Sequence, residues 1–140
     1  MFVVSEAAAD RPGPLVVAGG VLAAIVVSSL ADSAIAILAH AAGAPADFAP
    51  LAPASYIFLT ALGVSVGAFG WAIVRRTARD PRALLARLAP TVVLLSFVPD
   101  FFLLGTGGVT GVAALLAMHI TVAVVAVLTF HRVMPVDQVR

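Results

Sequence analysis

Four long apolar segments limit what this chain can fold into. A helix that crosses a bilayer needs roughly 20 mainly apolar residues, because each residue adds 1.5 Å along the axis. We therefore predict an all-α protein, in which residues 1–140 form one integral membrane domain built as an antiparallel bundle of four transmembrane helices. The predicted helices lie at approximately 15–39, 54–74, 84–104 and 112–130.

Composition excludes a soluble fold. Hydrophobic residues make up 62% of the chain and charged residues 11%, whereas soluble domains are about 25% charged. A small soluble fold also leaves too much surface exposed to hide so many apolar side chains. The absence of cysteine excludes disulfides, thiolate metal sites and cysteine nucleophiles. Arginine without lysine, together with abundant alanine, suggests a GC-rich bacterial genome, so we expect a multi-pass protein of the bacterial plasma membrane.

The arginines predict the orientation. Cytoplasmic loops of membrane proteins are enriched in Lys and Arg. Five of the eight arginines lie between positions 75 and 87, at the connection of the second and third helices, and the other three flank the bundle at Arg11, Arg132 and Arg140. The other two connections contain none, so both termini are predicted to be cytoplasmic.

The segments between the helices have the composition of loops and turns. Residues 40–53 are rich in Pro, Ala and Gly and predict a loop, and the glycine-rich residues 105–111 predict a short turn. Trp71 and Tyr56, near the two ends of the second helix, fit anchoring at the membrane–water interfaces. A cleaved signal peptide ending near Ala39 is the competing interpretation, but its apolar region would be about 7–15 residues, and this one is much longer.

Ionisable residues inside the predicted helices are candidates for function. Such groups cost about 2.5–3.5 kcal/mol at the bilayer centre. By helical rise, Asp32 lies roughly 10–12 Å, Asp100 roughly 6–8 Å and His119 roughly 10 Å from the outer ends of their helices. Thr60 and Ser96 lie at comparable depth. We hypothesise an outward-facing polar pocket in which Asp100, with Asp32 as a second candidate, pairs with His119 and binds a proton, a cation or a polar head group.

Each of these residues also has a purely structural explanation. Asp100 follows Pro99 and can mark the end of a helix, Asp32 can bond to a neighbouring serine, and His119 can hydrogen-bond an adjacent helix, a contact worth about 0.6 kcal/mol on average. The histidines and aspartates lack the spacing of a metal site. Nucleotide, metalloprotease and serine-hydrolase motifs are also missing from the sequence, so no cofactor and no nucleic-acid partner are predicted.

Small residues in the second helix predict close helix packing. Gly63, Gly67 and Gly70 form a small-xxx-small pattern, which lets two helix backbones approach each other. Packing within the chain's own bundle is favoured, and a homodimer through the second helix is the alternative. The arginine-rich connection sets topology and can also attract anionic lipid head groups, at about 1 kcal/mol per basic residue.

Several short motifs resemble a known group of proteins. The run Val92–Asp100 (VVLLSFVPD), the run Ala114–His119 (ALLAMH) and the sequence Gly70-Trp71-Ala72 before an arginine-rich turn are similar to those of small actinobacterial four-helix integral membrane proteins of unknown function. The resemblance covers nearly the whole chain and implies a membrane bundle, without catalytic residues to carry over. Asp32 is not part of that pattern, so the resemblance assigns it no role.

Three hypotheses for function remain open. The first is a non-enzymatic membrane protein whose outward-facing polar pocket binds a small ligand, a lipid or a proton. The second is a membrane-embedded enzyme that acts on a lipid or isoprenoid, with Asp100 or Asp32 as general acid and His119 as partner. The third is a structural or accessory membrane subunit in which these polar residues only fix helix packing.

Overall fold

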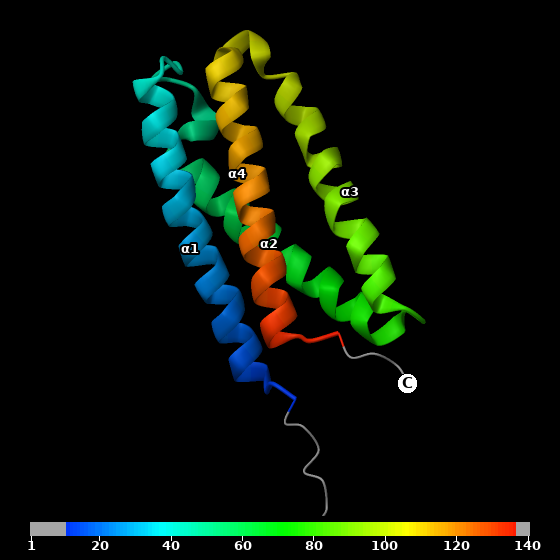
Figure 1. Cartoon of the computed structure of the whole chain (residues 1–140). Coiled ribbons are helices and arrows are strands. Elements are labelled where there is room, and N and C mark those ends of the chain that lie inside the picture. Colours follow the sequence, from blue (N-terminus) through cyan, green and yellow to red (C-terminus); the bar gives the residue numbers. More distant parts are fainter. Residues whose placement is uncertain (1–10, 137–140) are drawn as a thin grey trace, which may run out of the picture.

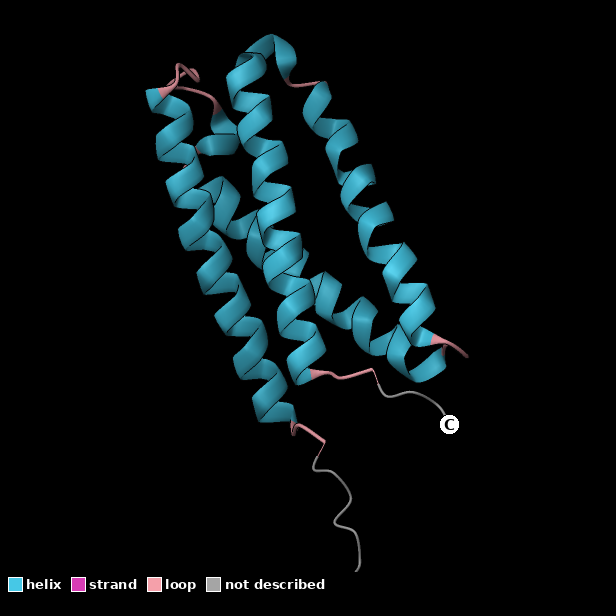
Figure 2. Cartoon of the chain, in the orientation of Figure 1, coloured by secondary structure: helices cyan, strands magenta, loops and turns pink. Residues whose placement is uncertain are grey.

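The chain is all-helical over residues 11–136, the part that the computed structural model describes (Figures 1 and 2). All four α-helices are long and apolar enough to cross a membrane, which confirms the prediction of four such helices in an all-helical chain. The elements are α1 (Pro14–Ala41), a 3-10 turn η1 (Ala49–Leu51), α2 (Pro53–Thr77), α3 (Pro81–Phe101) and α4 (Leu104–Val133).

Three of the helices begin at proline. Pro14, Pro53 and Pro81 open α1, α2 and α3, at the position where the missing N–H of proline costs nothing and its fixed φ suits the helix. The carboxylate of Asp80 then caps α3 by accepting a hydrogen bond of 3.0 Å from the backbone N–H of Ala83. These local signals are why the helix starts fall within three residues of the predicted ones.

The start of α4 differs from the prediction. Residues 105–111 lie within α4 rather than in a connecting turn, although the backbone of Gly108 is not helical, and only residues 102 and 103 connect α3 to α4. The glycines of this segment change the shape of α4 instead of forming a connecting turn. Gly108, at φ 63° and ψ −177°, bends the helix near its beginning, and a residue with a side chain rarely adopts that backbone conformation.

A close approach by Phe48 explains two further glycines. A Cβ added to Gly107 would collide with the ring of Phe48, and a Cβ added to Gly111 would lie 3.0 Å from it. The ring of Phe48 is 5% exposed. The glycine-rich start of α4 is therefore a notch that receives this ring from the loop between α1 and η1.

The helices pack unevenly. The beginning of α1, the end of α4 and the α2–α3 connection lie at one end of the molecule, and the other connections lie at the opposite end (Figure 1). The largest interface joins α1 to α4, and α3 packs chiefly against α4. Of the four spans, α3 is the least buried. One helix is thus held more loosely than the other three.

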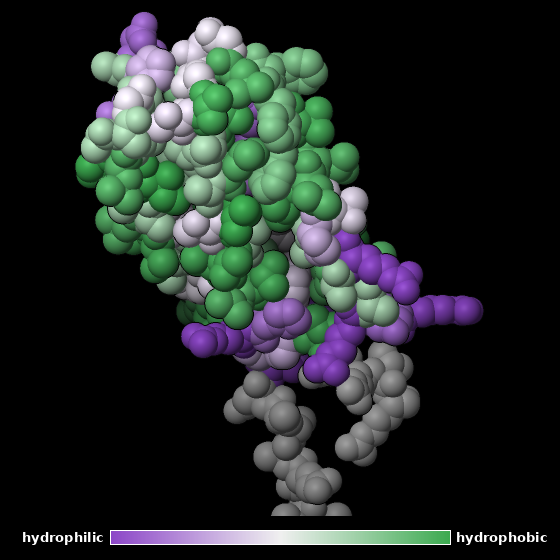
Figure 3. Space-filling model, turned by 45° about the horizontal axis from the view of Figure 1, so that its top comes forward, coloured by the Kyte–Doolittle hydropathy of each residue, from purple (hydrophilic) through white to green (hydrophobic). Residues whose placement is uncertain are grey.

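The outer surface suits a lipid environment. Large hydrophobic side chains cover the body of the molecule, and hydrophilic side chains gather mainly at one end, with a smaller group at the opposite end (Figure 3). Leucines and phenylalanines from every helix are more than half exposed, among them Leu22, Leu30, Phe58, Phe69, Leu94 and Leu128. A folded chain of this size would not leave so much apolar surface in water.

A polar layer divides the core. One apolar cluster surrounds Phe48 and Met118 near η1, and a second surrounds Trp71 and Phe130 toward the opposite end. Between them the buried positions of α1 and α2 are polar, namely Ser28, Asp32 and Thr60. The buried stripe of α1 continues as alanine on both sides of this layer.

The predicted interfacial anchoring of Trp71 and Tyr56 is wrong, because both side chains are buried, at 5% and 7% exposure. The indole N–H of Trp71 donates a hydrogen bond of 3.1 Å to the carbonyl oxygen of Met134. The hydroxyl of Tyr56 lies 3.0 Å from that of Ser33. Both polar tips are satisfied inside the protein, so these residues join α2 to α4 and to α1.

Candidate functional site

The centre of the candidate site is Asp32 on α1. Its carboxylate is 1% exposed and accepts a hydrogen bond of 2.6 Å at Oδ2 from the hydroxyl of Thr60 on α2. Asp32 lies nine residues before the end of α1, about 14 Å along the axis. A carboxyl group is therefore held well inside the bundle by a single side-chain donor.

Several polar atoms around Asp32 have no hydrogen-bond partner among the described residues. They are Oδ1 of Asp32 and the hydroxyl oxygens of Ser28 and Ser29. Ser28 is 0% exposed and lies one helical turn before Asp32, on the same face of α1. A buried polar atom without a partner costs about 1–3 kcal/mol, so a proton or a small polar species would stabilise this layer.

The second part of the site joins α3 to α4. Nδ1 of His119 lies 3.1 Å from Oδ2 of Asp100 and 2.8 Å from the carbonyl oxygen of Leu115. The carbonyl oxygen can only accept, so Nδ1 carries the hydrogen. Its N–H is aligned with Leu115, and Oδ2 of Asp100 makes no aligned hydrogen bond. The contact between Asp100 and His119 is therefore mainly electrostatic.

This geometry leaves one ring nitrogen of His119 available. Because Nδ1 carries the hydrogen, Nε2 is the nitrogen that gains or loses a proton. The His119 side chain is 36% exposed, whereas that of Asp100 is 10% exposed. The imidazole can thus exchange a proton at Nε2 without breaking its contacts to Leu115 and Asp100.

The two parts of the site together draw on all four helices. His119 on α4 lies against Asp100 on α3, and Thr60 on α2 donates a hydrogen bond to Asp32 on α1. Each helix therefore contributes one member of the site, which we call the polar cluster: Asp32 (α1), Thr60 (α2), Asp100 (α3) and His119 (α4).

The hydroxyl of Ser96 makes no hydrogen bond to another helix among the described residues. Its hydroxyl donates a hydrogen bond of 2.6 Å to the carbonyl oxygen of Val93 in its own helix.

Ser28 and Ser29 were not singled out from the sequence as members of the site. They follow the apolar run of α1 without a distinguishing motif, and only the helix rotation shows that Ser28 faces inward.

The three glycines of α2 have different surroundings. A Cβ added to Gly67 would lie 3.5 Å from the ring of Phe130 on α4, whereas Gly63 and Gly70 face open space. Within the described chain, only Gly67 of these three is in position for close packing against another helix. The bundle does not account for Gly63 and Gly70.

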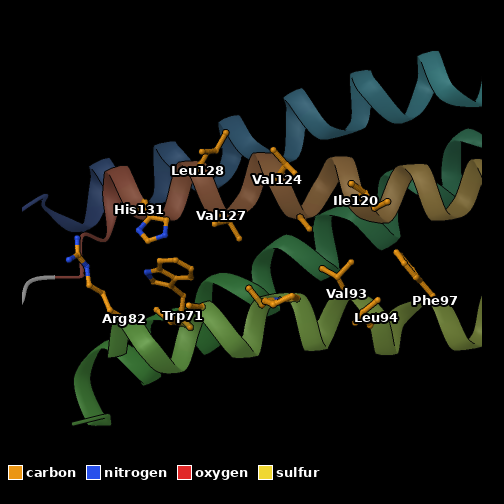
Figure 4. Close-up of a pocket in the computed structure, with 15 residues that line it drawn as sticks. Trp71, Arg82, Val93, Leu94, Phe97, Ile120, Val124, Val127, Leu128 and His131 are labelled. Carbon is orange, nitrogen blue, oxygen red and sulfur yellow. The ribbon is translucent and has the colours of Figure 1, made fainter. Parts of the chain in front are cut away.

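An apolar groove lies between α3 and α4. Its volume is about 980 Å³, and it extends from Arg82, Trp71 and His131 at one end to Phe97 and Ile120 at the other (Figure 4). No member of the polar cluster lines it. Phe97 separates the two sites, because its ring packs edge-on against His119 with 6.0 Å between the ring centres.

The chemistry available to the polar cluster is acid–base chemistry. Two carboxyl groups and one imidazole can hold and release protons, and Thr60 supplies a neutral donor. Within residues 11–136, no group of three or more His, Asp or Glu side chains is placed to hold a metal ion. The described part of the site therefore offers groups that can exchange protons.

Comparison with known proteins identifies a family but not an activity. The family of unknown function DUF6069 matches residues 12–135, which include all four helices and the polar cluster. No curated protein and no solved structure matches the chain. Since the match spans most of the sequence, the chain belongs to the DUF6069 family of unknown function.

Proposed function

We propose that this chain is a multi-pass protein of the bacterial plasma membrane, an antiparallel bundle with both termini in the cytoplasm. The charge distribution supports this orientation. Most hydrophilic side chains gather at one end of the structure (Figure 3), where the last turn of α2 carries Arg75 and Arg76, the α2–α3 connection carries Arg79 and the end of α4 carries Arg132. Arginine-rich segments stay on the cytoplasmic side. Arg140 lies outside the described residues.

We infer that the polar cluster binds and releases a proton within the membrane. With both carboxyls ionised and His119 protonated, two negative charges and one positive charge leave one uncompensated negative charge. An isolated charge in such surroundings costs several kcal/mol. One added proton on a carboxyl group makes the cluster neutral, and Oδ1 of Asp32, which has no partner among the described residues, is a position where it can be held.

The contact that carries this proposal is the 3.1 Å approach of His119 Nδ1 to Asp100 Oδ2. It places an exchangeable imidazole, partly exposed, beside a carboxyl group that is largely buried. A proton gained at Nε2 strengthens the attraction between α3 and α4, and its loss weakens that attraction. Because α3 is the least buried span, its position would respond to the charge of this pair.

Infrared spectroscopy of the protein in lipid vesicles tests the proposal, since a protonated carboxyl group has its own C=O band. We expect the wild type to show this band at low pH and to lose it as the pH is raised. Asp32→Asn or Asp100→Asn should remove or shift it, and Asp80→Asn should leave it unchanged, because Asp80 is an exposed helix cap at the other end of α3. If the band is missing at every pH, the cluster binds no such proton and only fixes helix packing.

One observation favours an enzyme that acts on a lipid or isoprenoid as the second candidate. Phe97 lines the apolar groove and also touches His119, so a rotation of this ring would open the groove toward the acid–base pair. Incubation with membrane lipids and mass spectrometry of the products tests this candidate. Turnover that is lost in His119→Gln and enhanced or altered in Phe97→Ala would support it. Absence of turnover by the wild type would exclude these lipids as substrates.

A further inference from the structure

Small side chains line part of the groove between α3 and α4. Ala86 and Ala89 of α3 face Ala123 of α4, and Pro90 adds a short ring. Larger residues at these positions would close the space, as Phe97 and Ile120 do at the end of the groove (Figure 4). The resulting cavity is partly open rather than enclosed.

The length of the groove suits a lipid chain. Phe97 lies fifteen positions after Arg82 on α3, which corresponds to about 22 Å of helix. One leaflet of a bilayer contributes about 15 Å of hydrocarbon. The groove therefore extends through one leaflet, with its side opening facing the acyl chains of the surrounding lipids.

The two ends of the groove differ in charge. Arg82 and His131 lie at the same end, on α3 and α4, and Trp71 forms the wall between them (Figure 4). The ring of His131 packs edge-on against Trp71, with 4.7 Å between the ring centres. Arg82 makes no ion pair or side-chain hydrogen bond within residues 11–136. Its guanidinium is therefore available to an external anion.

We propose that this groove binds one phospholipid with a net negative head group. One acyl chain lies along the alanine-lined floor between α3 and α4, and the phosphate contacts Arg82 beside His131. The charge of the groove decides the occupant, since a basic residue near the surface attracts an anionic head group and guanidinium pairs well with phosphate. This inference concerns a different site from the polar cluster and does not rest on proton binding.

Trp71 provides the probe, because it is the single tryptophan of the chain and is 5% exposed. Phospholipids with brominated acyl chains quench tryptophan fluorescence on contact. A lipid reaches Trp71 through the groove that this residue lines. We compare brominated phosphatidylglycerol with brominated phosphatidylcholine, each at a low fraction of the lipid in phosphatidylcholine vesicles that contain the full chain.

We expect half-maximal quenching of the wild type at a concentration of brominated phosphatidylglycerol about fivefold lower than that of brominated phosphatidylcholine. This ratio is the preference expected from one basic residue in contact with an anionic head group. Arg82→Gln should abolish this preference, and Arg82→Lys should retain most of it. Arg79→Gln is the matched control, since Arg79 is exposed in the α2–α3 connection, three positions before Arg82, and does not line the groove. Equal quenching of the wild type by both lipids would overturn the proposal.

Filling the groove gives an independent check. Ala123→Phe should reduce quenching by both lipids at least about fivefold, by blocking the floor on which the acyl chain lies. Ala113→Phe, at an exposed position of α4 outside the groove, should have no effect. If Ala123→Phe impairs folding, Ala123→Leu replaces it. A second copy of the chain in the groove would contradict lipid binding. In that case quenching would be the same for both lipids and would decrease as the protein-to-lipid ratio is raised.

Discussion

Thr60 donates a hydrogen bond of 2.6 Å to Asp32, and this bond joins α2 to α1 between the two apolar halves of the core. Asp32 is buried more completely than nearly every hydrophobic residue of the chain. A membrane helix would be more stable with an apolar residue at this depth. The retention of a carboxyl group there is the feature that our account of function explains.

Removal of the donor to Asp32 should destabilise the bundle. Thr60→Val keeps the shape of the side chain and leaves both oxygens of Asp32 without a donor. We expect the free energy of unfolding to fall by about 1–3 kcal/mol, measured by denaturation in mixed detergent. Thr60→Ser retains the hydroxyl and should lose less than half as much. Equal losses in the two variants would mean that the methyl contacts of Thr60, rather than its hydrogen bond, stabilise the core.

The Phe48 notch predicts a contrast between two glycines. Gly107→Ala should lower the free energy of unfolding by about 1–3 kcal/mol, because its Cβ collides with the buried ring of Phe48. Gly105→Ala, two residues away with open space around its Cβ position, should be neutral or slightly stabilising, since alanine favours helix. The same denaturation assay compares them. A stable Gly107→Ala protein would show that the ring is not held in the notch.

Coupling between Asp100 and His119 can be measured with a double-mutant cycle. We expect the changes in unfolding free energy caused by Asp100→Asn and His119→Gln to be non-additive by about 0.5–3 kcal/mol, as for two residues in direct contact. Ser96→Ala, combined with His119→Gln, provides the additive control, because Ser96 bonds within its own helix. Additivity of both pairs would leave the 3.1 Å contact without energetic significance.

The predicted orientation can be tested with cysteines, because the chain has none of its own. Single substitutions Ala46→Cys and Thr77→Cys place thiols at exposed positions before η1 and at the end of α2. In intact cells a membrane-impermeant thiol reagent should label Ala46→Cys and not Thr77→Cys, and both should react after lysis. The reverse pattern would place the arginine-rich end outside the cytoplasm.

The sequence was sufficient to predict the helices but not all of their ends. Four apolar segments predicted the number of spans, and the predicted starts of α1, α2 and α3 lie within three residues of Pro14, Pro53 and Pro81. The glycines at 105–111 were misassigned to a turn, because a glycine that permits a bend and a glycine that makes room for Phe48 have the same sequence signal. Trp71 and Tyr56 were misplaced for a related reason: their partners Met134 and Ser33 are distant along the chain.

The candidate site was predictable in its residues but not in its contacts. Charge inside an apolar segment singled out Asp32, Asp100 and His119. Their mutual placement depends on how each helix is rotated and on how far α4 extends beyond α3, and neither quantity can be derived from apolar periodicity alone. The same limit explains why Ser28 was not expected at the site and why Ser96, at similar depth, bonds only within its own helix.

Nitrogen-15 NMR of the histidine side chains, with the full chain in lipid vesicles, tests most directly whether the polar cluster exchanges a proton. The spectrum of His119→Gln identifies the signals of His119. We predict that Nδ1 stays protonated at every pH while Nε2 gains and loses a proton, and that Asp100→Asn moves this transition. A His119 signal that remains in one state across the pH range, or a transition that Asp100→Asn leaves unchanged, would contradict the account.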